Sequence, residues 1–256
     1  MRRGLAPSRQ QAQADIAAGR VTVGGAPADK PARLVAPGEP IRVLGPGPRF
    51  VGRGGEKLDA ALARFSVTVE GRRAHDLGAS TGGFTDCLLQ RGATAVVAVD
   101  VGYGQLHERL RADARVEVHE RTNVRDLTPG DLGEPAELVV ADLSFISLRT
   151  VLPAVLALCA AGADLVLLVK PQFEAGREEA ARGRGVITDP GIWQRVLREV
   201  TAALEREGAA IMGVMASPLT GADGNVEFLV HARAAAPPAI DVGGAIDRAI
   251  AEAGAR

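Results

Sequence analysis

The 256-residue chain has few of the residues that hold disulfide-rich or metal-bound proteins together. Its two cysteines, Cys87 and Cys159, have no paired Cys or His spacing, so neither a disulfide framework nor a zinc site is expected. The four histidines stand singly, which is typical of surface positions or of satisfied core positions. We therefore expect no metal, and we interpret both cysteines as small buried hydrophobic residues.

Long apolar runs are also missing. No run approaches the ~20 residues that a helix needs to span a bilayer, and the N-terminus lacks the charged-then-apolar order of a signal peptide. Hydrophobic residues are 46% of the chain and charged residues 24%, which argues against global disorder. These features predict a folded cytoplasmic protein, with one large domain or a main domain and a small appendage.

The net charge of −1 conceals an uneven distribution along the chain. Residues 1–53 hold nine lysines and arginines but three acidic residues, whereas the remainder is acidic overall. A basic segment on a mildly acidic body is typical of a polyanion-binding appendage attached to a catalytic or ligand-binding domain. A solvated basic face would give the same composition, so charge alone does not distinguish it from a polyanion-binding appendage.

Residues 1–44 predict a small α+β module. Ser8–Gln11 fits a capping box, from which a helix would run over residues 9–18 and end at Gly19. Alternating residues at 21–23 and 41–44 predict two short strands. Arginines in or beside the expected helix are Arg2, Arg3, Arg9 and Arg20. Residues 45–54, which begin with alternating glycine and proline, predict a linker.

Residues 55–256 alternate between strand-like and helix-like segments. Helices are expected at 58–65, 84–91, 146–159 and 192–206 and after Pro238, and strands at 94–99, 116–119, 138–143, 164–169, 209–216 and 226–232. Such alternation predicts an α/β fold of Rossmann-like type, with a mostly parallel sheet covered by helices on both faces. Ligand chemistry in these folds lies at the carboxyl ends of the strands.

A glycine-rich loop follows the first expected strand of this domain. It comprises Asp76, Gly78, Ala79, Ser80, Thr81, Gly82 and Gly83. Glycine lets a loop backbone approach a ligand closely, and Asp100, at the end of the next strand, could accept hydrogen bonds from two ribose hydroxyls. The loop departs from the GxGxxG pattern of dehydrogenases and resembles the cofactor loop of S-adenosylmethionine (SAM) methyltransferases. That resemblance implies Asp76 near the methionine end of SAM, and Asn123 or Asp126 near the adenine.

Charged residues directly follow two apolar runs. Asp142 follows LVVA and Lys170 follows LVLLV, where ionisation is costly, so together they predict a site. Lys57 would stand at a helix start, where a cation opposes the helix dipole. It either belongs to the same site or is an exposed lysine that reaches water.

The chemical class of the group that accepts the methyl can be found by excluding two alternatives. The words after Asp142 are not the Asn/Asp-Pro-Pro-aromatic turn of base-amino methyltransferases. Both cysteines fall in expected helices, whereas methylation of a pyrimidine carbon needs a cysteine nucleophile at a strand end. A hydroxyl acceptor remains.

Lys57, Asp142, Lys170 and Glu227 together resemble the Lys-Asp-Lys-Glu set of FtsJ-type ribose 2′-O-methyltransferases. A ribose hydroxyl is a poor nucleophile, so a base must take its proton, and a lysine serves if burial or a neighbouring cation lowers its pKa. We expect Lys170 to be this base and Asp142 to orient it. Lys57 and Glu227 would then position the ribose and balance the charge.

Longer words resemble the TlyA family of bacterial rRNA methyltransferases from residue 3 to about residue 230, among them DLGASTGGFTDCLLQRGA, VVADLSFISL, LVKPQFEAG and SPLTGADGNVEF. RGLAPSRQQAQADIAAGRVTVGG resembles the RNA-binding module named after ribosomal protein S4. The resemblance implies SAM-dependent cytidine 2′-O-methylation of 16S or 23S rRNA or both, with the four N-terminal arginines on RNA phosphates. Family members begin with a complete first helix, so we expect either a start codon placed too late or a module shortened at its start.

Alternatives remain for one loop and for the whole chain. Residues 174–189, with Arg177, Arg182 and Arg184, would be either a substrate-covering loop that binds phosphate or an ordinary surface loop. The chain could also be a non-catalytic RNA-binding or ribosome-assembly protein, against which the four intact charged residues argue. A membrane-lytic haemolysin is disfavoured because no spanning segment or strongly amphipathic basic helix is present.

Overall fold

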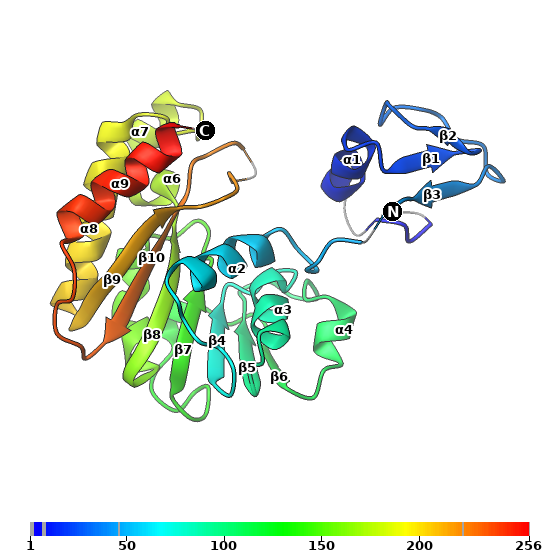
Figure 1. Cartoon of the computed structure of the whole chain (residues 1–256). Helices are drawn as coiled ribbons and strands as arrows, with labels where there is room; N and C mark the ends of the chain where they lie inside the picture. The colour runs from blue at the N-terminus through cyan, green and yellow to red at the C-terminus, as the bar shows by residue number, and fades with distance from the viewer. Residues whose placement is uncertain (1–2, 7–8, 46, 222, 256) are drawn as a thin grey trace. The chain divides into compact units, whose positions relative to one another are not determined.

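The computed structural model describes residues 3–6, 9–45, 47–221 and 223–255 (Figure 1). Arg2 and Ser8 lie outside the described residues, and with Ser8 so does the expected capping box. The chain divides into two compact units, residues 1–51 and residues 52–256.

The larger unit is built on a seven-stranded sheet in the order β6-β5-β4-β7-β8-β10-β9. The strands are β4 (Arg73–Leu77), β5 (Ala95–Val99), β6 (Val116–His119), β7 (Ala136–Ala141), β8 (Cys159–Val169), β9 (Ala209–Ala216) and β10 (Phe228–Ala234). β4 to β8 are parallel, whereas β10 runs antiparallel between β8 and β9. The expected mostly parallel sheet is confirmed.

Helices connect most of these strands. They are α2 (Gly54–Arg64), α3 (Gly83–Gln90), α4 (Glu108–Arg111), the 3-10 helix η1 (Val124–Asp126), α5 (Leu148–Ala157), α6 (Pro171–Glu174), α7 (Arg177–Arg182), α8 (Pro190–Arg206) and α9 (Val242–Gly254). Several begin with a side-chain cap: Ser147 accepts a hydrogen bond at the start of α5, and Asp189 does so at α8. The turn residues of the sequence therefore fix where these helices begin.

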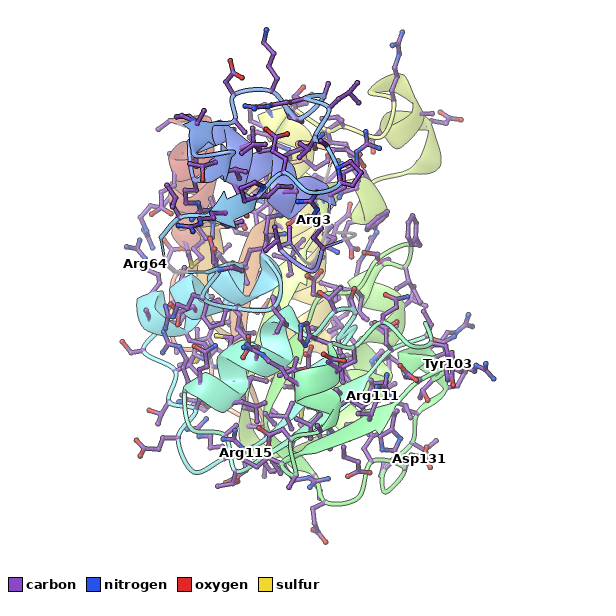
Figure 2. The ribbon with its side chains drawn as sticks, turned by 90° about the vertical axis from the view of Figure 1, so that its right-hand side faces the viewer. Arg3, Arg64, Tyr103, Arg111, Arg115 and Asp131 are labelled. Carbon is purple, nitrogen blue, oxygen red and sulfur yellow. The ribbon has the colours of Figure 1, made fainter. Side chains whose placement is uncertain are left out.

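The strands present alternate side chains to the two faces of the sheet. Leu77, Val97, Val139 and Leu165 belong to one buried cluster with apolar residues of α5, α8 and α9. α2 and α3 lie side by side in front of the sheet (Figure 1), and their apolar residues are buried while Arg64 extends outward at the end of α2 (Figure 2). Helices on both faces leave the carboxyl ends of the parallel strands open for a site.

Two expectations about the larger unit were wrong. Cys159 is not in a helix, because α5 ends at Ala157 and β8 begins at Cys159, pairing with Ala136 of β7 through an irregular register. It is half-buried rather than buried, and burial raises the pKa of its thiol to about 12, so it remains an inert thiol. The segment 174–189 is not a simple loop, since it contains α7, whose first turn carries Glu178 and Glu179 at the favourable end of the helix dipole.

The smaller unit consists of α1 (Arg9–Ala17) and a three-stranded antiparallel sheet in the order β2-β1-β3. β1 (Val21–Val23) and β3 (Ile41–Val43) were expected, and β2 (Ala26–Pro27) was not, being only two residues long. Val21, Val23 and Ala28 form a small core. The expected helix followed by a small sheet is confirmed.

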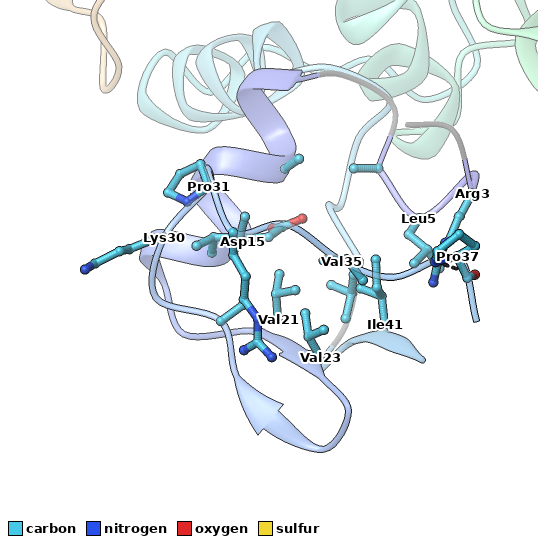
Figure 3. Close-up of a pocket in the computed structure, with 16 residues that line it drawn as sticks. Arg3, Leu5, Asp15, Val21, Val23, Lys30, Pro31, Val35, Pro37 and Ile41 are labelled. Atoms are coloured by element: carbon cyan, nitrogen blue, oxygen red, sulfur yellow. Dashed lines mark hydrogen bonds between the residues drawn. The ribbon is translucent and has the colours of Figure 1, made fainter. Parts of the chain in front are cut away.

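A hollow of about 570 Å³ lies beside that core (Figure 3). Val21, Val23, Val35 and Ile41 line it, so the apolar side chains of this unit form a wall as well as a core. The guanidinium of Arg3 borders the hollow and donates hydrogen bonds to the carbonyl oxygens of Ala36 and Pro37, at 2.9 and 2.7 Å.

Candidate functional site

Two lysine–carboxylate ion pairs lie in the larger unit. Lys57, in the first turn of α2, pairs with Glu227, which directly precedes β10. Lys170, at the end of β8, has its Nζ 2.6 Å from Oδ1 of Asp142, which directly follows β7. Parallel neighbours β7 and β8 bring the second pair together, because their carboxyl ends meet at one edge of the sheet.

Both ion pairs open into one cleft of about 340 Å³. Its other walls come from the start of α2, the glycine-rich loop, Ser144 and Gly221. The four expected catalytic residues are therefore gathered at a single cavity, although they are spread over 170 positions of the chain. Their assignment as catalytic residues stays a prediction, since geometry shows proximity and not chemistry.

The Lys57 side chain does not reach water as an exposed lysine would. It is 7% exposed, and Glu227, 3% exposed, supplies the compensating charge. A buried ion pair of this kind is weak evidence for stability, because desolvation of both charges offsets their attraction. The pair therefore needs a reason other than folding, which the shared cleft provides.

The Lys170 amine also donates a hydrogen bond of 2.8 Å to Oγ of Ser144. Ser144 stands two positions after Asp142, so one short segment supplies both partners of the amine. The chain contains only three lysines, Lys30, Lys57 and Lys170, and two of them line this cleft. Lysine can lose a proton at an active site, whereas arginine cannot.

A second cavity, of about 310 Å³, lies beside the cleft. Gly78, Ser80, Asp142 and Ser144 line both cavities, and Asp100 and Asn123 line the second alone. Asp126, the alternative to Asn123, is exposed outside this lining, so the geometry favours Asn123. A ligand in the second cavity would thus touch the residues that also border the two lysines.

Gly78 is required by two features of the backbone. Its φ is +91°, and a Cβ there would lie 2.5 Å from the carbonyl oxygen of Asp142. Only glycine allows both this conformation and this approach of the loop to the strand end. The sequence pattern of a strand, a glycine and an acid therefore reflects close packing at the point where the two cavities meet.

Asp100 orders the wall of the second cavity through its carboxylate. Oδ2 accepts a hydrogen bond from the backbone N–H of Ser80 and Oδ1 accepts one from Gly102, both at 2.7 Å. The acid expected at the end of the next strand thus already organises the glycine loop. Its remaining acceptor capacity faces a cavity that it lines.

Other residues of the glycine loop are placed differently. Ala79, Thr81 and Gly83 line the cleft rather than the second cavity, and Gly82 lines neither. Gly82 has a φ of +98° and precedes α3, where a Cβ would overlap the side chain of Leu110. Its requirement for glycine is thus a matter of packing and turn geometry.

Asp76 is fully buried under the loop and lines neither cavity. Its Oδ2 accepts a hydrogen bond of 2.6 Å from the Thr85 hydroxyl, whereas Oδ1 has no partner among the described residues. Burial raises the pKa of this carboxyl to about 7, and the hydrogen bond from Thr85 acts in the opposite direction. A buried carboxylate oxygen without a partner fits a nearby cationic or hydrogen-bonding ligand.

Sequence reasoning missed two residues at this site. Ser144 and Phe145 both lie in the word DLSF, in which only the acid attracted attention. Phe145 lines the second cavity with a φ of +64°, is 91% exposed, and stands 5.1 Å from the ring of Phe173. The features that mark Phe145 are its exposed aromatic ring and its rare backbone conformation, and both are visible only in the structure.

The expected RNA-binding arginines are only partly free. The Arg3 guanidinium is bound to backbone carbonyls of residues 36–39, and Arg20 pairs with the buried carboxylate of Asp15. Arg9 is exposed on α1. In the 174–189 segment Arg184 is exposed, and the side chains of Arg177 and Arg182 lie outside the described set.

Within the described parts of the chain, no group of three or more His, Cys, Asp or Glu side chains is placed to hold a metal ion. None of the helices described there is long and apolar enough to cross a membrane.

Comparisons with known proteins agree along the length of the chain. A model described as FtsJ-like methyltransferase matches residues 50–234, and a model described as S4 domain matches residues 2–41. A Mycobacterium tuberculosis protein named 16S/23S rRNA (cytidine-2′-O)-methyltransferase TlyA is 50% identical over 98% of this chain and 95% of its own length.

Solved structures give the same picture. One from Streptococcus thermophilus, described as a candidate hemolysin, is 41% identical, with a TM-score of 0.82 over 99% of this chain and 93% of that one. A SAM-dependent methyltransferase from Mesorhizobium loti is 20% identical, with a TM-score of 0.51 over 71% of this chain and 100% of that one. The second likeness concerns the fold alone.

Proposed function

We propose that this chain, which belongs to the FtsJ-like methyltransferase family and carries an S4 domain, transfers a methyl group from SAM to a ribose 2′-hydroxyl of ribosomal RNA. The observation that carries the proposal is the pair of lysine–carboxylate contacts in one cleft, which shares a wall with the cavity of the glycine loop. The cytidine specificity and the choice of 16S or 23S rRNA follow the name of the M. tuberculosis relative.

SAM fits the second cavity by its chemistry. Asp100 offers carboxylate oxygens to ribose hydroxyls, Asn123 offers an amide to an adenine edge, and Gly78 lets the loop backbone close on Asp142 where the two cavities meet. Asp76, whose Oδ1 has no described partner, would support the methionine end from beneath the loop. When bound, SAM supplies a methyl group on a sulfonium sulfur, which keeps both electrons of the broken carbon–sulfur bond as the ribose oxygen takes the methyl group.

Lys170 is the proposed general base. The hydroxyl proton passes to its Nζ as the ribose oxygen attacks, and a lysine must enter this step as the neutral amine. Asp142 and Ser144 hold that nitrogen from one side, which directs its free position towards the cleft. Lys57 and Glu227 line the same cleft, where a cation and a carboxylate can bind the remaining ribose oxygens.

The proposed partner is ribosomal RNA, free or in a ribosomal subunit, and the proposed location is the cytoplasm. Arg2, Arg3, Arg9 and Arg20 are the proposed phosphate contacts of the S4 domain. RNA would have to displace the internal contacts of Arg3 and Arg20, whereas Arg9 is exposed as it stands. The exposed ring of Phe145 offers a surface on which an unstacked base could lie.

The decisive experiment combines analysis of cellular rRNA with assays of the purified protein. Mass spectrometry of rRNA nucleosides from strains with and without the gene should show 2′-O-methylcytidine only where the gene is present. Purified Lys170→Ala and Lys170→Arg should bind SAM and transfer no methyl group, since arginine keeps the charge but does not lose a proton. Lys30→Ala, which alters the only lysine outside the cleft, is the matched control.

Unchanged 2′-O-methylcytidine in the deletion strain would contradict the function, and full activity of Lys170→Arg would remove Lys170 as the base. The same assays address the rivals. A non-catalytic RNA-binding protein would give no methyl transfer in any form. A haemolysin, as the S. thermophilus relative is described, would lyse red cells without altering rRNA.

A further inference from the structure

Five ionisable side chains line the cleft, and their charges do not balance. Lys57 pairs with Glu227, and Lys170 pairs with Asp142. The fifth residue is Arg53, which is exposed and forms no ion pair or hydrogen bond with its side chain among the described residues. While both lysines are protonated in these pairs, the cleft carries one uncompensated positive charge, and that charge belongs to Arg53.

The position of Arg53 is unfavourable for the fold alone. It is the N-cap of α2, with φ −59° and ψ −24°, and it precedes Lys57 by four residues, so both cations lie on the same side of the helix start. A cation at this end of a helix opposes the helix dipole. Glu227 compensates Lys57, and Glu56 stands in the first turn of α2, but no described carboxylate forms an ion pair with Arg53.

RNA chemistry supplies the missing anion. The carbon that bears a 2′-hydroxyl is bonded to the carbon whose oxygen carries the 3′ phosphodiester, so a ribose at Lys170 brings one negative charge with it. A guanidinium matches phosphate oxygens with two parallel hydrogen bonds. We propose that Arg53 binds the phosphodiester on the 3′ side of the methylated ribose. The inference rests on the proposed function and adds the residue that holds the substrate backbone in the cleft.

A phosphate contact positions RNA without reading its sequence or taking part in the chemistry. Arg53→Ala should therefore raise the KM for an rRNA fragment carrying the mapped methylation site by about tenfold, the loss expected for one charge-assisted hydrogen bond. kcat should change less than twofold, and SAM affinity should not change. The slope of log KM against log salt concentration should fall by about 0.7, the value for one phosphate contact on single-stranded RNA.

Chemically altered RNA makes the test specific. A neutral methylphosphonate at the 3′ phosphate should raise the KM of the wild type by about tenfold and should leave the KM of Arg53→Ala unchanged. The same change at the 5′ phosphate should affect both proteins equally. Arg53→Lys keeps the charge and should recover part of the loss. Arg64→Ala, which removes an exposed arginine from the other end of α2 (Figure 2), is the matched control and should behave as wild type.

The possible failures are distinguishable. A wild type that methylates no RNA overturns the proposed function and this inference with it. An active wild type with an unaltered KM and salt slope in Arg53→Ala overturns only the role of Arg53. Equal sensitivity of wild type and Arg53→Ala to the 3′ methylphosphonate also overturns it, because the two changes would then act independently.

Discussion

Lys170 donates a hydrogen bond of 2.8 Å to Ser144 Oγ while its Nζ lies 2.6 Å from Asp142 Oδ1. Both oxygens belong to the segment that follows β7, and the amine stands at the end of β8. The register between these strands therefore sets the direction of the amine. In the proposed reaction this direction decides whether the nitrogen faces the ribose hydroxyl.

Replacing Ser144 by alanine should lower kcat by about tenfold or more, since a misdirected base loses part of its contribution. SAM affinity and the KM for RNA should stay close to wild type, because the charged residues of the cleft remain. Ser144→Thr retains an oxygen at the same position and should recover most of the rate. Single-turnover methyl transfer measures the effect. A wild-type rate in Ser144→Ala would show that Asp142 alone orients the amine.

Single and double substitutions of the buried pair Lys57–Glu227 should have different effects on the free energy of unfolding. Glu227→Gln leaves Lys57 as a buried cation without a counter-charge and should cost about 3 kcal/mol of unfolding free energy. The double variant Lys57→Met/Glu227→Gln removes the charge as well and should regain much of that loss while methyl transfer stays absent. Urea unfolding and methyl transfer are the two measurements.

The exposed pair of Arg64 and Glu252, which also involves α2, is the control for that comparison. Arg64→Ala and Glu252→Ala should each change stability by less than about 1 kcal/mol, as exposed pairs do. Recovered activity in the double variant would contradict a functional reason for the buried pair. An equally unstable double variant would show that packing around the two side chains, and not charge, dominates.

Much of the larger unit was predictable because each strand, and the glycine loop, produces a pattern within a short stretch of sequence. Asp142 and Lys170 follow unbroken apolar runs, and a strand buried on both faces produces such runs. The glycine loop was predictable for the same reason, since strand, turn and acid lie close together in the chain. Local sequence thus located four of the strand ends that meet at the site, those of β4, β5, β7 and β8.

Other features depend on contacts that local sequence does not encode. The partner of Lys57 lies 170 positions away, and β10 enters the sheet antiparallel beside β8, which periodicity cannot reveal. Cys159 was misplaced because residues 159–163 carry no strong strand signal, and the pairing of Cys159 with Ala136 of β7 is a contact that local sequence does not encode. The role of Arg53 could not be predicted, because a charge without a partner can be recognised only when the ion pairs of the surrounding residues are known.

The Asp76 carboxyl should make stability depend on pH. Its pKa is raised to about 7 in the folded protein, so between about pH 4 and pH 7 the folded chain keeps a proton that the unfolded chain loses. Stability contributed by this group is therefore present at low pH and lost as pH rises through that interval. Asp76→Asn removes the titration and keeps an acceptor for the Thr85 hydroxyl.

Relative to wild type, Asp76→Asn should gain about 2 kcal/mol of unfolding free energy between pH 5 and pH 7. Urea unfolding of both proteins without SAM gives this difference, in which the titrations common to both cancel. A difference that does not change with pH would mean that Asp76 ionises in the folded protein as it does in the unfolded chain.

Glu174 should help to hold Lys170 in position through hydrogen bonds that lie outside the cleft. Its buried carboxylate accepts hydrogen bonds from the Leu148 backbone at 2.6 Å, the Ser147 hydroxyl at 2.5 Å and the Arg149 guanidinium at 3.2 Å. Glu174 ends α6, which begins directly after Lys170, so these bonds tie the Lys170 segment to the start of α5.

Replacing Glu174 by alanine leaves a buried backbone N–H and part of Arg149 without acceptors, which should cost about 2–3 kcal/mol of unfolding free energy. It should also lower kcat, because Lys170 loses a fixed support, while the KM for RNA stays unchanged. Glu174→Gln keeps one acceptor oxygen and should recover part of both losses. Glu199→Ala removes the other carboxylate on Arg149, a more exposed one, and should leave kcat intact. A destabilised Glu174→Ala with wild-type kcat would show that the β8 strand end positions Lys170 without help from α6.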